Sequence, residues 1–305
     1  MGKMITASEL ITEPFSLPAA GGGTMRGEID RAAGGAVARC ILLPAFGLTS
    51  LDLLALAYYL LCNGFEVVRF DPTCHVGTSD GEVIDFRLGQ LAADIDRVVE
   101  VHADRDTSVI GISLSSRAAF RALARHMLRG VFFLSPVVNT RQTLFEVCSE
   151  DLVGKYLDRS LPELYSILGL TVNREFCGDC LDQNLASLNG TLTDAASIAV
   201  PTCLIVGSED RWVATDEVER VAAVMPTARM VTISGANHQM FKSPVIFQSY
   251  IATLLREMFS LYDLVGEPIV PRFADVVRYI NGVKRESKAS AVRRVGQPLH
   301  CQESL

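Results

Sequence analysis

Residues 108–117 read Ser108-Val109-Ile110-Gly111-Ile112-Ser113-Leu114-Ser115-Ser116-Arg117, an apolar run that ends in a turn of small residues. The pattern predicts a strand, a sharp bend that carries Ser113, and a helix rich in Ala and Arg over residues 115–126. This is the layout of a nucleophile elbow, where a tight turn lifts a serine oxygen above the edge of an α/β sheet. Gly111 supplies the small residue before the bend. Ser115 stands two positions after the nucleophile, where glycine is common, so the motif alone is an imperfect match.

An acid and a histidine follow this serine in the order that the chemistry requires. A serine hydroxyl is a weak nucleophile unless a base takes its proton and a carboxylate orients that base. In α/β-hydrolases the acid and then the histidine lie on loops after late strands. Here Asp210 follows the apolar run 202–207, and His238 follows the run 230–233. Taken singly, Ser113 or Asp210 could cap a helix and His238 could be a surface residue. Together they predict a Ser113–Asp210–His238 catalytic triad.

The rest of the chain alternates between predicted strands and predicted helices. Short apolar or alternating runs indicate strands at residues 13–17, 24–29, 40–44, 65–71 and 131–134. Apolar residues at helical spacing, with start and stop signals, indicate helices at residues 51–62 (capped by Ser50), 88–99, 215 onward, 244–259 and 273–279. The glycine run 21–23 joins the first two strands into an antiparallel hairpin. Such alternation predicts an α/β-hydrolase fold, with a mostly parallel central sheet flanked by helices.

Residues 136–199 interrupt this alternation, with helical patterns at 140–147 and 162–168 and no convincing strand. An insertion here lies above the carboxyl edge of the sheet, where α/β proteins bind substrates, so we interpret it as a helical cap. The predicted organisation is an α/β-hydrolase core over residues 1–135 and 200–282, the cap over 136–199, and a flexible polar tail over 283–305. The apolar cap residues either line a pocket for a hydrophobic substrate or pack the cap's own core: Leu144, Phe145, Leu161, Leu164, Tyr165, Ile167, Leu168 and Leu170.

Composition argues against several other classes of protein. The 305 residues are 49% hydrophobic, enough for a large core, and the net charge of −7 argues against a nucleic-acid surface. The longest apolar runs are too short to span a bilayer and no secretory signal is visible, so we expect a cytoplasmic protein. Basic tracts at residues 117–129 and 284–294 are candidate contacts for an acidic partner, although solvated surface charge is the simpler interpretation.

The eight cysteines are scattered, and several lie inside predicted strands or helices. This is typical of a reducing compartment, where cysteine serves as a small apolar residue. Cys177 and Cys180 have the spacing of a redox or metal-binding pair. No second pair and no histidine lies near them in the sequence, so we interpret the spacing as chance. We therefore expect no metal and no cofactor.

Short segments between about residues 40 and 240 carry a resemblance to a known family. They are Ala45-Phe46, Asn63-Gly64-Phe65, Arg69-Phe70-Asp71, His75-Val76-Gly77, Ser113-Leu114-Ser115, Ser116-Arg117, Val138-Asn139, Asp210-Arg211-Trp212-Val213 and His238. These segments resemble the acyl transferase of bacterial luminescence, a myristoyl-ACP thioesterase within the α/β-hydrolase superfamily. A serine two positions after the nucleophile is part of that family's elbow, so Ser115 becomes a supporting match.

The resemblance implies Ser113 as nucleophile, Asp210 as orienting acid and His238 as base, which is the triad already predicted from chain order. It also implies that the enzyme releases or transfers a long-chain fatty acyl group from a thioester through an acyl-serine intermediate. The acyl donor is then an acyl carrier protein or coenzyme A. A complex with downstream enzymes that use the fatty acid is a further implication.

The oxyanion formed during acyl transfer needs two backbone N–H donors. We expect the first from Leu114, the residue after the nucleophile. We assign the second to Phe46, on the loop after the predicted strand at 40–44, with a neighbouring residue as the alternative. His75 follows another strand near the same edge and could approach the site, but we expect it to pack its loop.

Two other functions stay open at this point. A carboxylesterase or lipase would use the same three side chains, because the sequence does not separate an ester from a thioester substrate. A non-catalytic lipid-binding protein with this fold is the third interpretation. It is disfavoured because the hydroxyl, the imidazole and the carboxylate are all present.

Overall fold

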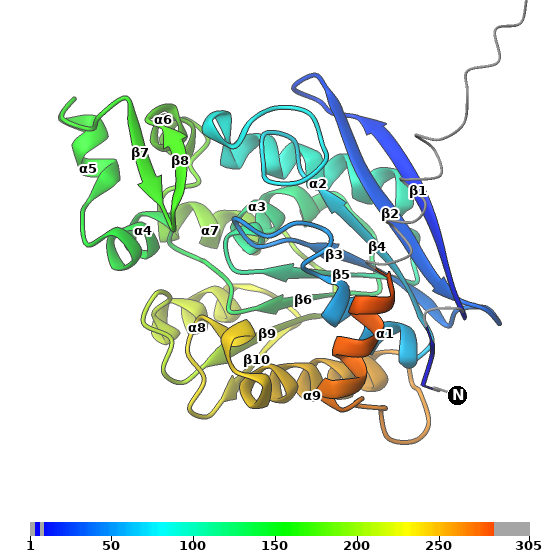
Figure 1. Cartoon of the computed structure of the whole chain (residues 1–305). Helices are drawn as coiled ribbons and strands as arrows, with labels where there is room; N and C mark the ends of the chain where they lie inside the picture. The colour runs from blue at the N-terminus through cyan, green and yellow to red at the C-terminus, as the bar shows by residue number, and fades with distance from the viewer. Residues whose placement is uncertain (1–3, 7–8, 284–305) are drawn as a thin grey trace, which may run out of the picture.

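The structure, a computed structural model, describes residues 4–6 and 9–283. Its central strands are β1 (Leu10–Pro18), β2 (Thr24–Ala32), β3 (Ala38–Leu43), β4 (Phe65–Asp71), β5 (Thr107–Ile112), β6 (Gly130–Leu134), β9 (Thr202–Gly207) and β10 (Ala228–Ile233). They form an eight-stranded sheet in the order β1-β2-β4-β3-β5-β6-β9-β10 (Figure 1). β2 pairs antiparallel with β1 and β4, and the remaining pairs are parallel. The predicted hairpin and the mostly parallel sheet are confirmed.

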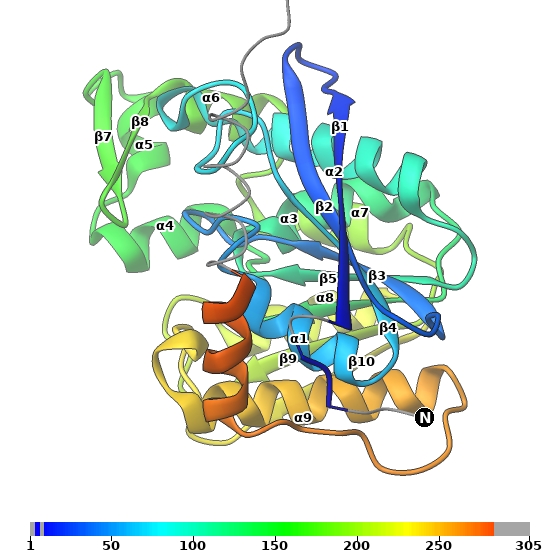
Figure 2. The same ribbon diagram turned by 45° about the vertical axis from the view of Figure 1, so that its right-hand side comes forward.

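Helices cover both faces of this sheet (Figures 1 and 2). One face carries α1 (Leu54–Cys62), α9 (Pro244–Leu261) and a helix at residues 273–283; the other carries α2 (Leu88–His102), α3 (Leu114–Ala122) and α8 (Thr215–Val224). Successive strand side chains point to opposite faces. On β3, Ile41 and Leu43 therefore share a core with α2 and α3, whereas Cys40 and Leu42 share a core with α1 and α9. Near-continuous apolar strands, buried on both faces, produce this arrangement.

The start of α1 differs from the prediction that Ser50 caps it. The helix begins at Leu54, and no side chain caps its N-terminus. The Ser50 N–H instead donates to Asp71 Oδ1 at 2.6 Å, and the Ser50 carbonyl accepts from Arg69 Nη1 at 3.2 Å. Ser50 therefore ties the loop after β3 to the end of β4, and residues 51–53 form a turn before the helix.

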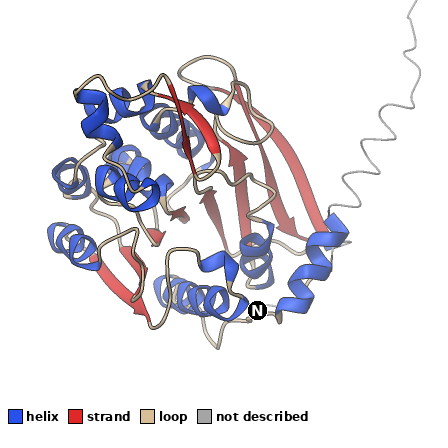
Figure 3. Cartoon of the chain, turned by 60° about the vertical axis from the view of Figure 1, so that its left-hand side comes forward, coloured by secondary structure: helices blue, strands red, loops and turns tan. Residues whose placement is uncertain are grey.

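Residues 136–199 contain helices and a small second sheet (Figure 3). The elements are α4 (Thr140–Cys148), α5 (Leu152–Leu157), β7 (Leu164–Ile167), β8 (Leu170–Asn173), α6 (Glu175–Asp182) and α7 (Leu188–Ala195). The predicted helix at 162–168 is wrong, because this stretch forms the first strand of an antiparallel hairpin. Leu168 and Gly169 both have positive φ, 51° and 85°, which is the backbone of a tight two-residue hairpin turn. The segment is thus not purely helical.

The predicted basic tracts have different outcomes. Arg117 and Arg121 both pair with Asp194 of α7, and Arg125 pairs with Asp96, so the first tract is largely neutralised by carboxylates within the fold. The tract at 284–294, like the predicted tail beyond Val283, lies outside the described residues. Among the residues that the structure describes, no helix has both the length and the apolar character needed to cross a membrane.

Candidate active site

Ser113 occupies the bend between β5 and α3. Its φ of 55° and ψ of −122° lie outside the usual regions for a residue with a side chain, as expected at a strained functional turn. The Ser113 N–H donates to the Leu134 carbonyl of β6 at 3.0 Å. The backbone of Ser113 therefore anchors the bend to β6, and the side-chain hydroxyl is not needed to hold the bend in place.

Small and buried polar neighbours allow this bend to close. A Cβ at Gly111 would lie 3.0 Å from Phe133 Cδ1, tighter than most real contacts, and 3.4 Å from Ser116 Oγ. Ser115 is buried, and its hydroxyl accepts from the Ile112 N–H at 3.0 Å and lies 3.2 Å from the Leu43 carbonyl. A serine replaces the usual glycine here because its hydroxyl bonds to the backbone at the ends of β5 and β3.

Ser113, His238 and Asp210 lie in one hydrogen-bonded chain. The Ser113 Oγ is 2.7 Å from His238 Nε2, and His238 Nδ1 is 2.8 Å from Asp210 Oδ2. The other carboxylate oxygen, Oδ1, accepts from the N–H groups of Trp212 and Val213 at 3.0 and 3.1 Å. Because a carboxylate only accepts, His238 carries its proton on Nδ1 and leaves Nε2 free to receive the serine proton. The three predicted residues are thus brought together from loops after β5, β9 and β10.

The imidazole and the carboxylate are shielded from water. The side chains of His238 and Asp210 are only 6% and 2% exposed. The Trp212 ring covers His238, with centroids 4.8 Å apart and planes tilted by 35°. Trp212 therefore packs against the histidine, and shielding strengthens the hydrogen bonds along the chain.

Neither of the two predicted oxyanion donors is used in the hydrogen bonds of the fold over residues 4–6 and 9–283. Within the described residues, no hydrogen bond is donated by the N–H of Leu114 or of Phe46. The next candidate on the same loop, Gly47, is not available, because its N–H donates to His75 Nε2 at 3.1 Å. This pattern favours Phe46 over Gly47 as the second donor.

His75 packs its loop, as predicted, and it packs against Phe46, the predicted second oxyanion donor. Its ring is 6% exposed, and it contacts the rings of Phe46 and Phe86 at centroid distances of 5.8 and 5.4 Å. Burial lowers the pKa of His75 from 6.5 to about 4, against weaker opposing effects of the Val76 backbone and the Asp71 charge. The signal in the sequence was a histidine directly after a strand that ends at the same sheet edge.

This buried ring predicts a pH dependence of stability. Between pH 6.5 and pH 4 the unfolded chain binds a proton on His75 that the folded chain does not. The stability that the neutral His75 ring contributes is therefore fully present above pH 6.5 and is lost as the pH falls to 4. A gap of this size corresponds to roughly 3 kcal/mol. Urea unfolding should show the native chain losing that much more stability over this window than a His75→Phe variant; parallel pH profiles would contradict it.

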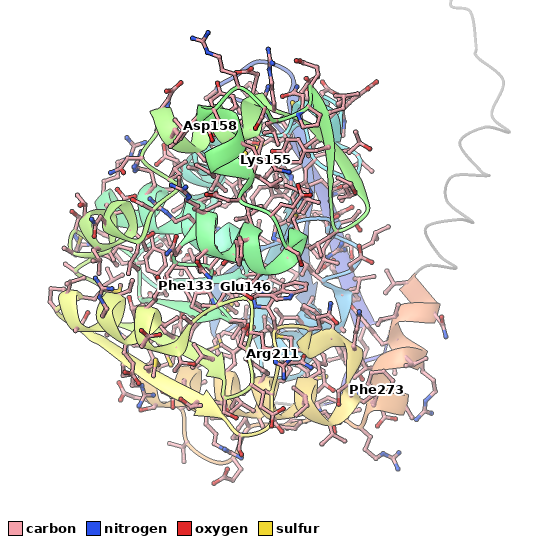
Figure 4. All side chains as sticks on the ribbon, turned by 90° about the vertical axis from the view of Figure 1, so that its left-hand side faces the viewer. Phe133, Glu146, Lys155, Asp158, Arg211 and Phe273 are labelled. Carbon is pink, nitrogen blue, oxygen red and sulfur yellow. The ribbon has the colours of Figure 1, made fainter. Side chains whose placement is uncertain are left out.

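A cavity of about 640 Å³ opens beside the histidine. Its walls come from the acid loop and the histidine loop and are mostly polar: Ser208, Glu209, Asp210, Arg211, Trp212, Asn237, His238 and Gln239. Figure 4 shows Arg211 on the same side of the molecule as Glu146 of α4, with Lys155 of α5 and Asp158, just after α5, farther along that side. The polar lining suits the polar part of a substrate better than its hydrocarbon chain.

Six of the eight apolar residues named above in segment 136–199 fall into two groups, and Tyr165 and Leu170 are intermediate in exposure. Leu144, Leu161 and Ile167 are buried in the main core, so they pack the interior as the second interpretation expected. Phe145, Leu164 and Leu168 are 46%, 48% and 53% exposed, and these three belong to α4 and the β7–β8 hairpin. The hairpin also approaches the loop after β3, since a Cβ at Gly47 would lie 3.3 Å from Leu170 Cδ1.

Cys177 and Cys180 are free thiols buried in α6. Burial raises the pKa of both thiols, and the Tyr165 hydroxyl lies 3.3 Å from Cys177 Sγ. Across residues 4–6 and 9–283, no group of three or more His, Cys, Asp or Glu side chains could hold a metal ion. A thiolate is the form that reacts and binds metal, so neither cysteine is poised for such a role.

Solved structures identify the fold. The chain is similar to the α/β hydrolase GrgF from Penicillium sp. sh18, with a TM-score of 0.65 and 17% identity over 83% of this chain and 98% of that chain. It is also similar to Est1E from Butyrivibrio proteoclasticus, solved with ferulic acid, with a TM-score of 0.64 and 18% identity over 81% and 99%. The protein therefore has the α/β-hydrolase fold.

Sequence comparison narrows the class to a family. Residues 40–287 match the acyl transferase family, and the chain belongs to it. It is 28% identical to the acyl transferase of Photobacterium phosphoreum over 229 residues, 72% of this chain and 74% of that protein. It is 28% identical to the acyl transferase of Vibrio harveyi over 207 residues, 66% and 68% of the two chains. The predicted family is confirmed, and the protein is an acyl-transferring enzyme of the α/β-hydrolase class.

Proposed function

We propose that this protein is a serine-dependent thioesterase or acyltransferase that takes a long-chain acyl group from a thioester. Ser113 is the nucleophile, His238 the general base and Asp210 the orienting acid. The observation that carries the proposal is the continuous chain of short hydrogen bonds from the Ser113 hydroxyl through His238 to Asp210. Such a chain activates a hydroxyl that is otherwise a poor nucleophile at neutral pH.

In the first step, His238 Nε2 accepts the Ser113 proton as Oγ bonds to the thioester carbonyl carbon. The carbonyl oxygen becomes an oxyanion, which the N–H groups of Leu114 and Phe46 stabilise. Collapse of this intermediate breaks the carbon–sulfur bond, and the imidazolium returns its proton to the departing sulfur. Asp210 holds the ring and stabilises its positive charge. The products of this step are a free thiol and an acyl ester on Ser113.

In the second step, water or another acceptor attacks the acyl-Ser113 ester while His238 again takes the proton. The ester bond breaks, and the proton returns to the Ser113 oxygen. We place the acyl chain beneath residues 136–199, acting as a cap, where the half-exposed Phe145, Leu164 and Leu168 offer apolar surface. The thiol-bearing arm occupies the polar cavity beside His238. An acyl carrier protein or coenzyme A would supply that arm.

The proposal is tested by mixing the enzyme with acyl thioesters of increasing chain length and recording intact-protein mass spectra. A mass increase of one acyl group, mapped to Ser113 and absent in Ser113→Ala, is the expected result. Matched oxygen esters run in parallel separate this function from a carboxylesterase. Faster turnover of the esters at every chain length would favour the esterase. Failure of a fluorophosphonate to label Ser113 would instead favour a non-catalytic lipid-binding protein.

A further inference from the structure

The loop that carries Phe46 is bonded to His75 on the neighbouring β4 loop. The Gly47 N–H donates to His75 Nε2 at 3.1 Å. Because Nε2 accepts, the ring is neutral and carries its proton on Nδ1. Burial keeps the pKa of His75 near 4, so this acceptor persists at neutral pH. The charge of Asp71 acts on the ring, and the rings in contact with it, Phe46 and Phe86, are uncharged.

This hydrogen bond selects the conformation of the loop. Residues 45–48 form a turn closed by the Leu48 N–H donating to the Ala45 carbonyl at 3.0 Å. Gly47, third in the turn, has a φ of +82°, which is the signature of a type II turn. Types I and II differ mainly in a flip of the central peptide, here the one between Phe46 and Gly47. An acceptor for the Gly47 N–H therefore favours one of the two orientations.

The scaffold behind the loop is itself rigid. Asp71 Oδ1 accepts from the Ser50 N–H at 2.6 Å, and its Oδ2 accepts from the Thr78 N–H at 2.8 Å. The Phe46 and Phe86 rings lie 5.2 Å apart and enclose the imidazole. The loop after β3 is thus joined at two points, through Ser50 to Asp71 at the end of β4 and through Gly47 to His75 on the loop that follows.

We propose that His75 is a positioning residue for the oxyanion loop: its bond to the Gly47 N–H holds the turn at residues 45–48 against the β4 loop. The free N–H of Phe46 lies on the preceding peptide of the same turn and is kept in place at the site with it. This inference rests on the proposed function, because it assigns an oxyanion to that N–H. His75 touches no reacting atom. His75 therefore affects the stabilisation of the oxyanion, where charge develops on the substrate oxygen. It does not affect the initial binding of substrate.

The test compares His75→Phe, which keeps a planar ring without an acceptor, with His75→Gln, whose amide oxygen can still accept. We expect His75→Phe to lower kcat by about 10- to 100-fold, less than the loss of a whole oxyanion donor, with KM changed by less than about twofold. His75→Gln should recover most of kcat. An unchanged kcat in His75→Phe, equal losses in both variants, or a rise in KM alone would overturn the proposal.

A matched control is His102→Phe. His102 is another partly buried histidine, packed on Phe15 at a centroid distance of 4.4 Å, and its Nε2 has no partner among the described residues. The same substitution there should leave kcat unchanged. A trifluoromethyl ketone, which forms an oxyanion on Ser113, should bind His75→Phe about 10- to 100-fold more weakly, in step with kcat. Unchanged inhibitor affinity would contradict the positioning role.

One readout does not depend on turnover. Nitrogen-15 NMR of histidine-labelled native protein should show His75 Nε2 unprotonated and Nδ1 protonated from pH 8 down to about 5, given its low pKa. Protonation of Nε2 in this range would overturn the proposal even if thioesters are substrates. If instead the tautomer is as expected but no acyl-enzyme forms on Ser113, the proposed function is wrong. The hydrogen bond between His75 and Gly47 would still be supported by that result.

Discussion

Replacing Ser113 by alanine is expected to lower kcat on thioesters by on the order of 10⁴-fold or more. The variant lacks the oxygen that forms the acyl-enzyme, while the imidazole, its Asp210 partner and the free N–H groups of Leu114 and Phe46 stay in place. What remains is the rate supported by binding and oxyanion stabilisation alone. Single-turnover kinetics with a long-chain thioester, read together with mass spectra, measures the loss and the missing intermediate.

Two neighbouring serines serve as controls for this experiment. Ser116 is buried in α3, and its hydroxyl has no partner among the described residues, so Ser116→Ala should leave kcat unchanged. Ser115→Ala removes bonds that hold the bend and should cost far less than the loss of Ser113. Comparable losses in Ser113→Ala and Ser115→Ala would show that the nucleophile is misassigned.

The second large effect is on stability and concerns the contact between α3 and α7. Arg117 is fully buried; it donates to Asp194 Oδ2 at 2.8 Å and to the Asn184 carbonyl at 2.9 Å. Burial lowers the pKa of Arg117, opposed by the charge of Asp194. Asp194→Leu would leave a buried cation without its partner. We expect a loss of about 3–5 kcal/mol in the free energy of unfolding, measured by urea denaturation.

Paired variants separate this charge effect from a simple change of packing. Arg121, a third exposed, donates to Asp194 Oδ1 at 2.8 Å, so Arg121→Met should cost less than about 1 kcal/mol. Arg117→Met combined with Asp194→Leu removes both charges and should recover most of the loss. A single Asp194→Leu that costs no more than Arg121→Met would show that the buried pair contributes little.

The sheet and the elbow could be predicted because they are encoded in neighbouring residues. The apolar runs that became β3 to β6 and β9 are buried on both faces, which a continuous hydrophobic stretch indicates directly. Gly111 and Ser113 stand in one short motif whose geometry is the same in many proteins. Asp210 and His238 could be assigned because the carboxyl ends of parallel strands meet at one edge.

The wrong predictions concern segments whose local sequence is compatible with two different structures. Residues 162–168 contain apolar residues compatible with a helix, and the hairpin forms because Leu168 accepts a left-handed backbone next to Gly169. Ser50 is a good helix cap by type, but the Asp71 carboxylate binds its N–H instead. The sequence suggests that Arg117 is a solvated surface charge, whereas in the structure its buried guanidinium pairs with Asp194.

Order along the chain was enough to single out Ser113, His238 and Asp210, the proposed triad, since each sits in a short pattern with its own strand. That the Gly47 N–H is already bonded, and that Arg117 has a buried partner, follow only from contacts between distant segments. Gly47 and His75 are 28 residues apart, and Arg117 and Asp194 are 77 apart. The physical reason is that a hydrogen bond between loops depends on how the strands are ordered in the sheet, and spacing in the sequence does not encode that order.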